Sequence, residues 1–437
     1  EEIVVKKHIR KKKVTFAEKT KNLPVEIREI TLPEEEQICS ICGTHLEVIG
    51  KETVRKELEY IPATLKVVEY VSAHYGCPKC KTDEEKPNII HAPVPPALLR
   101  SYASPSIVAW VIYSKYVNGM PLYRQEKDWL QYGFELSRAT MANWVIECTD
   151  KYLRVLYEFY HRLLLSREFA MADESPIQVL KEEGREATAK SYIWLFRSGE
   201  DDTPPIVLYK YASTRRGDVA KEFLKGFNGY LMADGYTGYN KVQDIKRCCC
   251  FAHIRRYFFD AIPKGKNRDI SCPAVQGVEY CDKLFAYERH FKEKGYSYKQ
   301  IKNGRLKKEK PVIEAFLSWL EKQKPIKGSK FATAVTYALN RKEHMMTYLE
   351  DGRCSLSNNL SEQKMKSYVI GRKGWLFSDS PEGAEASAIS YSIAETALAN
   401  GLNVYKNITY VLEKRPTEEM ADSELEKLLP WNDKVFE

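Results

Sequence analysis

No apolar run in the sequence approaches the ~20 residues that cross a bilayer, and no secretory signal opens it. No internal repeat with a period of about 20–50 residues is visible either. Disorder is excluded because 43% of the 437 residues are hydrophobic and 12% are aromatic. These absences predict a soluble chain without membrane spans, and its length predicts about two to four domains.

A disulfide framework is also lacking. The chain has eleven cysteines, and an odd number in a long sequence without a signal predicts a reducing cytoplasm. The net charge is +8 at pH 7, which indicates a polyanionic partner without identifying it. Residues 292–330 hold twelve Lys and Arg against four Asp and Glu; they are either a surface that follows a nucleic-acid backbone or a solvated charged face. The basic run at 8–13 is either a solvated tail or an arm that contacts phosphates.

Four cysteines form two Cys-x-x-Cys pairs. The intervening segments 54–61 and 64–74 are rich in Val, Ile and Tyr and predict two strands, so a hairpin would bring the pairs together. Four thiolates then complete a closed tetrahedral zinc site, with His45 and His74 as competing ligands that it does not need. A redox role would use one pair beside a βαβ unit. The predicted ligands of this structural zinc are Cys39, Cys42, Cys77 and Cys80.

The rest of the chain changes character twice. Residues 87–96 are rich in proline and predict a linker. Helical periodicity then runs to Leu165, with a break at 119–121, and predicts either a helix-turn-helix or a helical bundle beside the next domain. From residue 168 short apolar runs alternate with a helix, which predicts a mixed sheet. The expected strands are 169–171, 192–197, 206–211 and 229–233, with helices at 218–227, within 253–350 and at 385–400, and strand-like and turn-like pieces at 364–377.

Three acids stand out by their context. Asp173 ends an apolar β-type run, and Asp234 follows a short strand and precedes a glycine turn. Glu362 falls in the first turns of a helix that Asn358 or Asn359 caps. Two acids at strand ends and one on a helix can converge on two divalent metals that serve phosphodiester chemistry, and carboxylates suit Mg²⁺. Taken singly, each acid is a turn or cap residue.

Six segments in a fixed order resemble the transposases of the insertion sequence 66 family. The most telling are Ala-Asp-Glu-Ser-Pro-Ile-Gln-Val-Leu at 172–180, Ala-Asp-Gly-Tyr-Thr-Gly-Tyr-Asn at 233–240 and Asn-Asn-Leu-Ser-Glu at 358–362. The others are 114–125, 251–260 and 371–377. The likeness extends from Cys39 to about Leu412. Three consecutive cysteines at 248–250 replace the family's single one, and lysines at 364 and 366 stand where arginine is expected; neither departure affects the acids.

The resemblance implies a zinc-binding module before a DDE catalytic domain with an RNase H-like fold, and it assigns the metal-binding acids to Asp173, Asp234 and Glu362. The predicted fold class is multidomain α+β. Its parts are a basic tail at 1–30 left from a trimmed helical region, a zinc-ribbon-like module at 31–86, a linker and helix-turn-helix-like segment at 87–166, an RNase H-like α/β domain at 167–400 with a helical insertion at about 262–352, and a helical tail at 401–437.

The neighbours of the acids gain candidate roles from the same resemblance. His253, Arg255 and Arg256 lie on an expected helix and either contact DNA or are a buried histidine and ion-paired arginines. Arg372, Lys373 and Trp375 are expected in a turn where the cations hold phosphates and the indole stacks on an unpaired base. A core tryptophan beside a solvated turn is the alternative.

The predicted function is a bacterial DNA transposase that uses two Mg²⁺ or Mn²⁺ ions to cleave element ends and join them to target DNA. Its expected partners are double-stranded DNA, further copies in a dimer or larger assembly, and accessory proteins of the element. Its expected location is the cytoplasm, at the nucleoid, with no membrane. The alternatives are a non-catalytic zinc-containing DNA-binding protein and an RNase H-like nuclease without strand transfer.

Overall fold

The computed structural model describes residues 89–432 except 267–268, together with 51–53, 64–76 and scattered residues between 15 and 44. The chain divides into two compact units, Glu1–Thr64 and Leu65–Glu437, and the elements below belong to the second. All four predicted zinc ligands, the predicted strand at 54–61 and the basic run at 8–13 lie outside the described residues.

A short antiparallel ribbon pairs β1 (His74–Gly76) with β2 (Ile89–His91). The prediction of a strand over 64–74 is wrong, because residues 64–73 have no regular structure. Val67 and Val71 there are each 89% exposed, and β-type residues form a strand only where a partner pairs with their backbone. The segment predicted as a linker, residues 87–96, contains the short strand β2.

A group of helices precedes the main sheet. They are α2 (Pro105–Tyr116), α3 (Leu122–Gln131), α4 (Arg138–Cys148), the π-helical turn η3 (Thr149–Leu153) and α5 (Arg154–Leu165). Ser104 and Ser137 cap α2 and α4 with their hydroxyl groups. Because α2 and α4 both pack on helices near the C-terminus, the helical-bundle interpretation describes this packing, and DNA contact by α3 and α4 stays a prediction.

A mixed five-stranded sheet forms the centre, in the order β5-β4-β3-β6-β7. Its members are β3 (Phe169–Gln178), β4 (Lys190–Ser198), β5 (Val207–Ala212), β6 (Tyr230–Ala233) and β7 (Lys246–Cys249), with α6 (Asp218–Phe223) and the 3₁₀ turn η4 (Thr237–Lys241) between them. The first three strands are antiparallel, and β6 and β7 run parallel to β3. The mixed sheet and four of its strands confirm the prediction, although β3 extends beyond 171 because its second half still pairs with β4. The fifth strand, β7, was not predicted.

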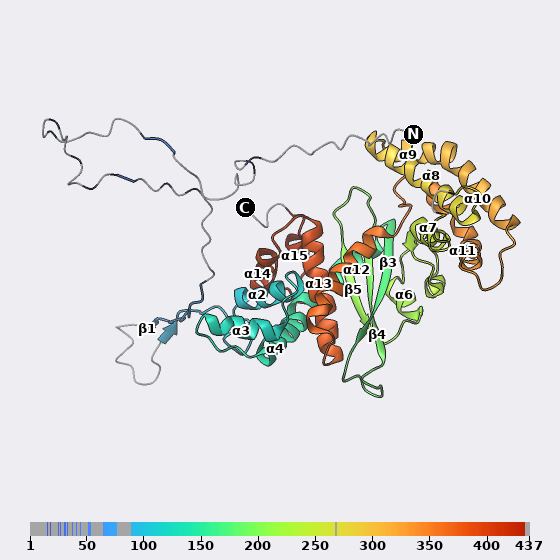
Figure 1. The fold of residues 1–437 in the computed structure, drawn as a ribbon. Helices are drawn as coiled ribbons and strands as arrows, with labels where there is room; N and C mark the ends of the chain where they lie inside the picture. The colour runs from blue at the N-terminus through green and yellow to red at the C-terminus, as the bar shows by residue number, and fades with distance from the viewer. Residues whose placement is uncertain are drawn as a thin grey trace. The chain divides into compact units, whose positions relative to one another are not determined.

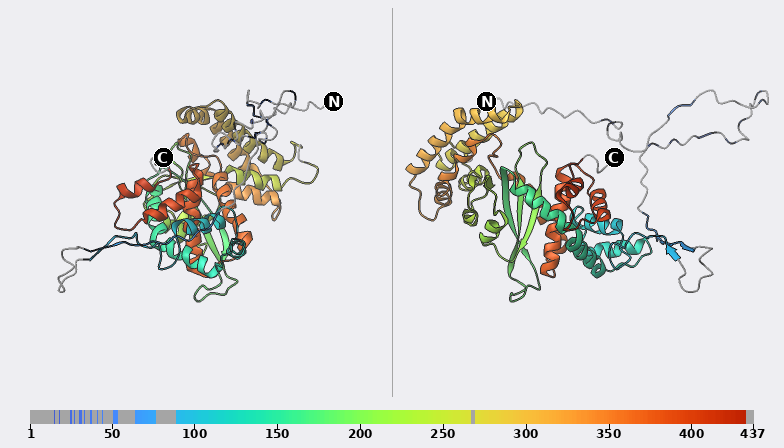
Figure 2. Two further views of the ribbon diagram at one scale, coloured as in Figure 1. Left: turned by 90° about the vertical axis from the view of Figure 1, so that its left-hand side faces the viewer. Right: turned by 180° about the vertical axis from the view of Figure 1, so that it is seen from behind.

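The sheet buries both faces. Ala170 and Ala172 of β3 join the core formed with α5 and α13 (Pro381–Ala399), whereas Phe169 and Met171 join the core formed with the helices after β7. Figures 1 and 2 show α13 beside β5 and the helices after β7 on the opposite side of the sheet. This period-two alternation is the expected pattern of a strand covered on two sides.

The Ala/Ser-rich helix α13 closes the β5 edge. Thr396 and Ser392 accept hydrogen bonds from the backbone N–H groups of Val207 (3.0 Å) and Tyr209 (2.8 Å). An edge strand leaves such groups unpaired, so the hydroxyl groups of α13 take the place of a sixth strand.

A helical segment separates β7 from the last catalytic candidate, Glu362. It comprises α7 (Phe251–Asp260), α8 (Pro273–Glu293), α9 (Tyr298–Gly304), the π-helical turn η5 (Arg305–Glu309), α10 (Lys310–Lys322), α11 (Lys330–Leu339) and the 3₁₀ turns η6 (Lys342–His344) and η7 (Thr347–Glu350). Arg305 is 2% exposed and donates to both oxygens of Glu288 at 2.7 and 2.8 Å. It also donates to the backbone carbonyls of Tyr348, Asp351 and Cys354, which anchors the approach to the next helix.

The chain ends in helices α12 (Asn359–Trp375), α13, α14 (Val404–Lys414), α15 (Asp422–Leu425) and the 3₁₀ turn η8 (Glu426–Leu428). The expected strand and turn pieces at 364–377 are wrong, since α12 continues to Trp375. Met365, Tyr368 and Gly371 are buried on one face at helical spacing. In the described part of the chain no helix is both long and apolar enough to cross a membrane.

Replacing Arg305 by methionine should lower the free energy of unfolding by about 3–5 kcal/mol, because Glu288 and three carbonyls lose their buried partner. Urea denaturation followed by circular dichroism measures the change. The exposed Lys322→Met on α10 is the matched control and should change it by less than about 0.5 kcal/mol. Equal effects of the two variants would contradict the anchoring role.

Candidate active site

The end of the parallel pairing between β3 and β6 brings two of the predicted acids together. The last paired residues are Met171 and Met232, and Asp173 and Asp234 each lie two residues further on. Side chains two positions apart share a face of a strand, so both carboxylates lie on the side of these methionines. Because Met232 also pairs with Cys248 of β7, Cys250 occupies the equivalent place on the third strand.

Glu362 reaches the same place from the first turn of α12. Asn358 is the N-cap residue, but its side chain does not cap the helix. Its amide Nδ2 instead donates to the carbonyl of Ala172 (2.9 Å), and its backbone N–H donates to Sγ of Cys250 (3.2 Å). The start of α12 is therefore fixed against β3, directly before Asp173, and against the end of β7.

The three acids share one electrostatic environment. Burial, followed by the negative charge of Glu174, raises the pKa of Asp173 to about 7, and Asp234 and Glu362 add to the rise. The Glu174 amide, at 2.9 Å from Oδ1 of Asp173, opposes it. No lysine or arginine in the described part of the chain forms an ion pair with Asp173 or Asp234. The negative charge at Asp173 and Asp234 fits a divalent cation, for which carboxylate oxygens are hard ligands.

Glu174 is a site residue that the sequence analysis missed. Its side chain is 2% exposed, and Arg215 donates to Oε1 through Nη2 at 2.6 Å and Nε at 2.9 Å. The hydroxyl of Tyr239 donates to the other oxygen. This charge-assisted network fixes the orientation of β3 at Asp173. Its signal in the sequence is the acid adjacent to Asp173 together with the tyrosines of the 233–240 motif.

The loop after β6 explains the Asp-Gly motif. Oδ1 of Asp234 accepts a hydrogen bond from the backbone N–H of Tyr236 (2.9 Å), while Arg247 donates to the Asp234 carbonyl (3.0 Å). A Cβ atom at Gly235 would lie 1.9 Å from Nη2 of Arg341. A side chain at this position would displace the guanidinium of Arg341, which donates to the Gly235 carbonyl.

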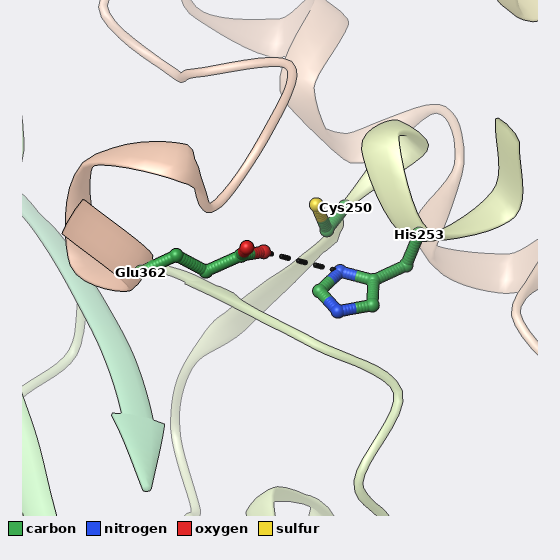
Figure 3. A group of neighbouring side chains, drawn as sticks. All are labelled: Cys250, His253 and Glu362. Carbon is green, nitrogen blue, oxygen red and sulfur yellow. Dashed lines mark ion pairs between the residues drawn. The ribbon is translucent and has the colours of Figure 1, made fainter. Parts of the chain in front are cut away.

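Two of the three DNA-contact candidates on α7 face the acids. Nδ1 of His253 lies 3.7 Å from Oε1 of Glu362, and Nη2 of Arg256 lies 3.4 Å from its Oε2. Figure 3 shows the imidazole and the carboxylate pointing toward each other. Arg255 instead forms an ion pair with Asp282 of α8, so it does not belong to this group.

The candidates at the end of α12 lie apart from these contacts. Trp375 packs against Tyr116 and Tyr391 with ring centroids 6.2 and 6.5 Å apart, as the core interpretation predicted, and base stacking stays a prediction. Arg372 donates to the Pro176 carbonyl, while Lys373 is exposed. All three lie on the last helical turn rather than in the expected turn.

Two of the segments that carry the resemblance meet here. A Cβ atom at Gly374 would lie 3.0 Å from the carbonyl oxygen of Gly119, in the break between α2 and α3. Gly119 itself adopts a φ of +66°, which favours glycine. The close approach of the α12 backbone to this break therefore favours glycine at 374.

Asp173→Asn should stabilise the protein in EDTA, because it removes one buried negative charge from a group of like charges. Mg²⁺ should raise the melting temperature of the wild type and should have little effect on the variant, since a bound ligand stabilises only the state that binds it. Thermal unfolding with and without Mg²⁺ measures both. Asp218→Asn, which changes an exposed acid paired with Lys241, is the control and should respond to Mg²⁺ like the wild type. A variant less stable than the wild type in EDTA would contradict the electrostatic argument.

Comparisons with known proteins find matches over most of the chain. Residues 100–386 match the family described as Transposase IS66 family, and residues 36–81 match the zinc-finger binding domain of transposase IS66. Among relatives, the uncharacterized proteins y4hP and y4jD of Sinorhizobium fredii are 28% identical over 429 and 420 residues. The alignments cover 92% of this chain in both cases and 75% and 80% of the two relatives. Since the transposase match spans more than half of the chain, the chain belongs to the IS66 family of transposases.

Proposed function

We propose that the chain is a DDE-type DNA transposase in which Asp173, Asp234 and Glu362 hold divalent metal ions. The observation that carries the proposal is the placement of Asp173 and Asp234 two residues beyond the last paired residues of β3 and β6, with Glu362 in the first turn of α12, where Asn358 binds the carbonyl of Ala172. Family membership supplies the transposase class. A mixed sheet with helices on both faces supports the RNase H-like fold that the resemblance implies.

Mg²⁺ or Mn²⁺ bound by these acids would activate an attacking oxygen and stabilise a leaving one. The protein's own contribution is rigid placement of the ligands. Arg215 and Tyr239 hold Glu174 next to the first acid, and Asn358 fixes the third acid relative to β3. Arg256, 53% exposed and beside Glu362, is placed to contact a phosphate of the scissile strand.

The reaction is cleavage followed by strand transfer. Water attacks the phosphodiester at the element end, so that one P–O bond forms as another breaks and a 3′-hydroxyl leaves. That hydroxyl then attacks a phosphodiester of target DNA in the same manner. Two ends must be joined to one target, which requires a dimer or a larger assembly on double-stranded DNA. Accessory proteins of the element are further proposed partners.

The zinc-finger match supports a structural Zn²⁺ held by four thiolates. The proposed ligands are Cys39, Cys42, Cys77 and Cys80. Together with the basic segment 292–330 this module would supply contacts to DNA that do not depend on the acids.

The test of catalysis is cleavage of a labelled element-end duplex by purified protein in Mg²⁺. Asp234→Asn and Glu362→Gln should each lower cleavage by more than about 10³-fold, because each removes a charge that positions the reaction. Both should retain DNA binding. Asp218→Asn is the matched control and should cleave within about twofold of the wild type.

The outcomes separate the candidate functions. Specific binding of the duplex without cleavage in Mg²⁺ or Mn²⁺ would refute the enzyme and favour a non-catalytic DNA-binding protein. Cleavage without joining to a target duplex would favour a nuclease without strand transfer.

For the zinc module, Cys77→Ser should lose about one equivalent of zinc from purified protein, measured by elemental analysis, because three thiolates and a water hold zinc far more weakly than four thiolates. Cys148→Ser, at a free buried cysteine, should keep it. Zinc-free native protein would contradict the four-thiolate site.

A further inference from the structure

Three side chains that differ in chemistry converge beside the acids. One ligand atom each from Cys250, His253 and Glu362 lies within 4.8 Å of the other two. Figure 3 draws these three side chains. They come from the end of β7, the first turn of α7 and the first turn of α12. Nδ1 of the imidazole and Oε1 of the carboxylate, 3.7 Å apart, are close to the separation of two ligands on a tetrahedral ion, about 3.3 Å for bonds of about 2.0–2.1 Å.

Two polar atoms of this cluster form no hydrogen bond. Nδ1 of His253 and Oε1 of Glu362 are both buried and form no hydrogen bond in the described structure. Arg256 contacts the other carboxylate oxygen, Oε2, and so leaves Oε1 facing the imidazole. Buried polar atoms without partners are costly, and two that face each other indicate a group that binds both.

The sulfur of Cys250 lies within 4.8 Å of the ligand atoms of the other two side chains. Cys250 is free, buried and the N-cap residue of α7. Its sulfur accepts a hydrogen bond from the backbone amide of Asn358 (3.2 Å), and a divalent cation bound there would hold it as a thiolate.

These donors select the class of cation. A thiolate, an imidazole and one carboxylate oxygen are a set that binds Zn²⁺ and Co²⁺, whereas Mg²⁺ takes oxygen ligands. The two anionic ligands balance a divalent charge, and three protein ligands leave one tetrahedral position for water.

We propose that Cys250, His253 and Glu362 form a binding site for a thiophilic divalent cation, with Zn²⁺ the best fit, distinct from both the four-thiolate module and the all-carboxylate site. Binding of such an ion would shorten the distances between the three ligand atoms by about 1 Å. Rotation of the side chains can supply this change.

The site has a consequence that rests on the proposed function. Glu362 belongs to both donor sets, and because its Oε2 contacts Arg256, only Oε1 is left to bind one ion or the other. Zn²⁺ at Cys250 and His253 would therefore withdraw Glu362 from the Mg²⁺ ligands and inhibit DNA cleavage, with relief when the thiolate is removed.

Titration of the full-length protein with Co²⁺ tests the site, because cobalt–thiolate bonds absorb in the near ultraviolet. The four-thiolate module contributes equally to the wild type and to Cys250→Ser, so the difference spectrum isolates the cluster. We expect Cys250→Ser to bind about one ion fewer. His253→Gln should keep the fold and weaken binding by more than about 100-fold, since loss of even an outer-shell partner costs about 10- to 100-fold.

Cys281→Ser, at a free buried cysteine of α8, is the matched control and should bind as many ions as the wild type. Equal stoichiometry and spectra in the wild type, Cys250→Ser and His253→Gln would overturn the proposal, as would an equal loss in Cys281→Ser. Cleavage assays separate this proposal from the proposed function. Mg²⁺-dependent cleavage by a protein that binds no metal at Cys250, His253 and Glu362 refutes the metal site and leaves the proposed function intact. Metal binding at the cluster in a protein that cuts no DNA refutes only the proposed function.

Discussion

The parallel pairing of β3 with β6 is the constraint on which the candidate active site depends. This pairing ends at Met171 and Met232. The two segments then carry Asp173 and Asp234, each two residues further on and on the same face. Without this register, Asp173 and Asp234 would have no reason to share an environment. β7 repeats the arrangement through its pairing with β6 and delivers Cys250, so the ends of three adjacent strands determine the chemistry of the region.

The surroundings of these strand ends resist the repulsion that the acids create. Glu174 forms an ion pair with Arg215 and accepts a hydrogen bond from the hydroxyl of Tyr239. Asn358 links α12 to β3 through an uncharged amide. The groups that hold this region in place thus lie next to Asp173 and Asp234 and form no ion pair with these two carboxylates. Such a site costs stability in the absence of a ligand, and this is typical where charge is held ready for binding.

The sequence predicts those parts of the site that depend on local pattern. Short apolar runs located the strands before Asp173 and Asp234, and the sequence around Glu362 located the start of a helix. The error over 364–377 arose because α12 carries two glycines, whose low helix propensity is outweighed by burial of Met365 and Tyr368. The contacts of Cys250 and Asn358 were not predicted because they join residues 108 and 186 positions apart. No local pattern encodes such contacts, and the roles of the site residues stay predictions.

The hydroxyl groups with which α13 covers β5 have a consequence for assembly. Thr396 and Ser392 use the outward backbone N–H groups of Val207 and Tyr209, and Thr396 also donates to the Val207 carbonyl. A second copy therefore finds no free main-chain groups at these positions and cannot extend the sheet by adding a strand there. Any contact between two copies at this edge must therefore be made by side chains, which leaves the sheet that bears the acids unchanged.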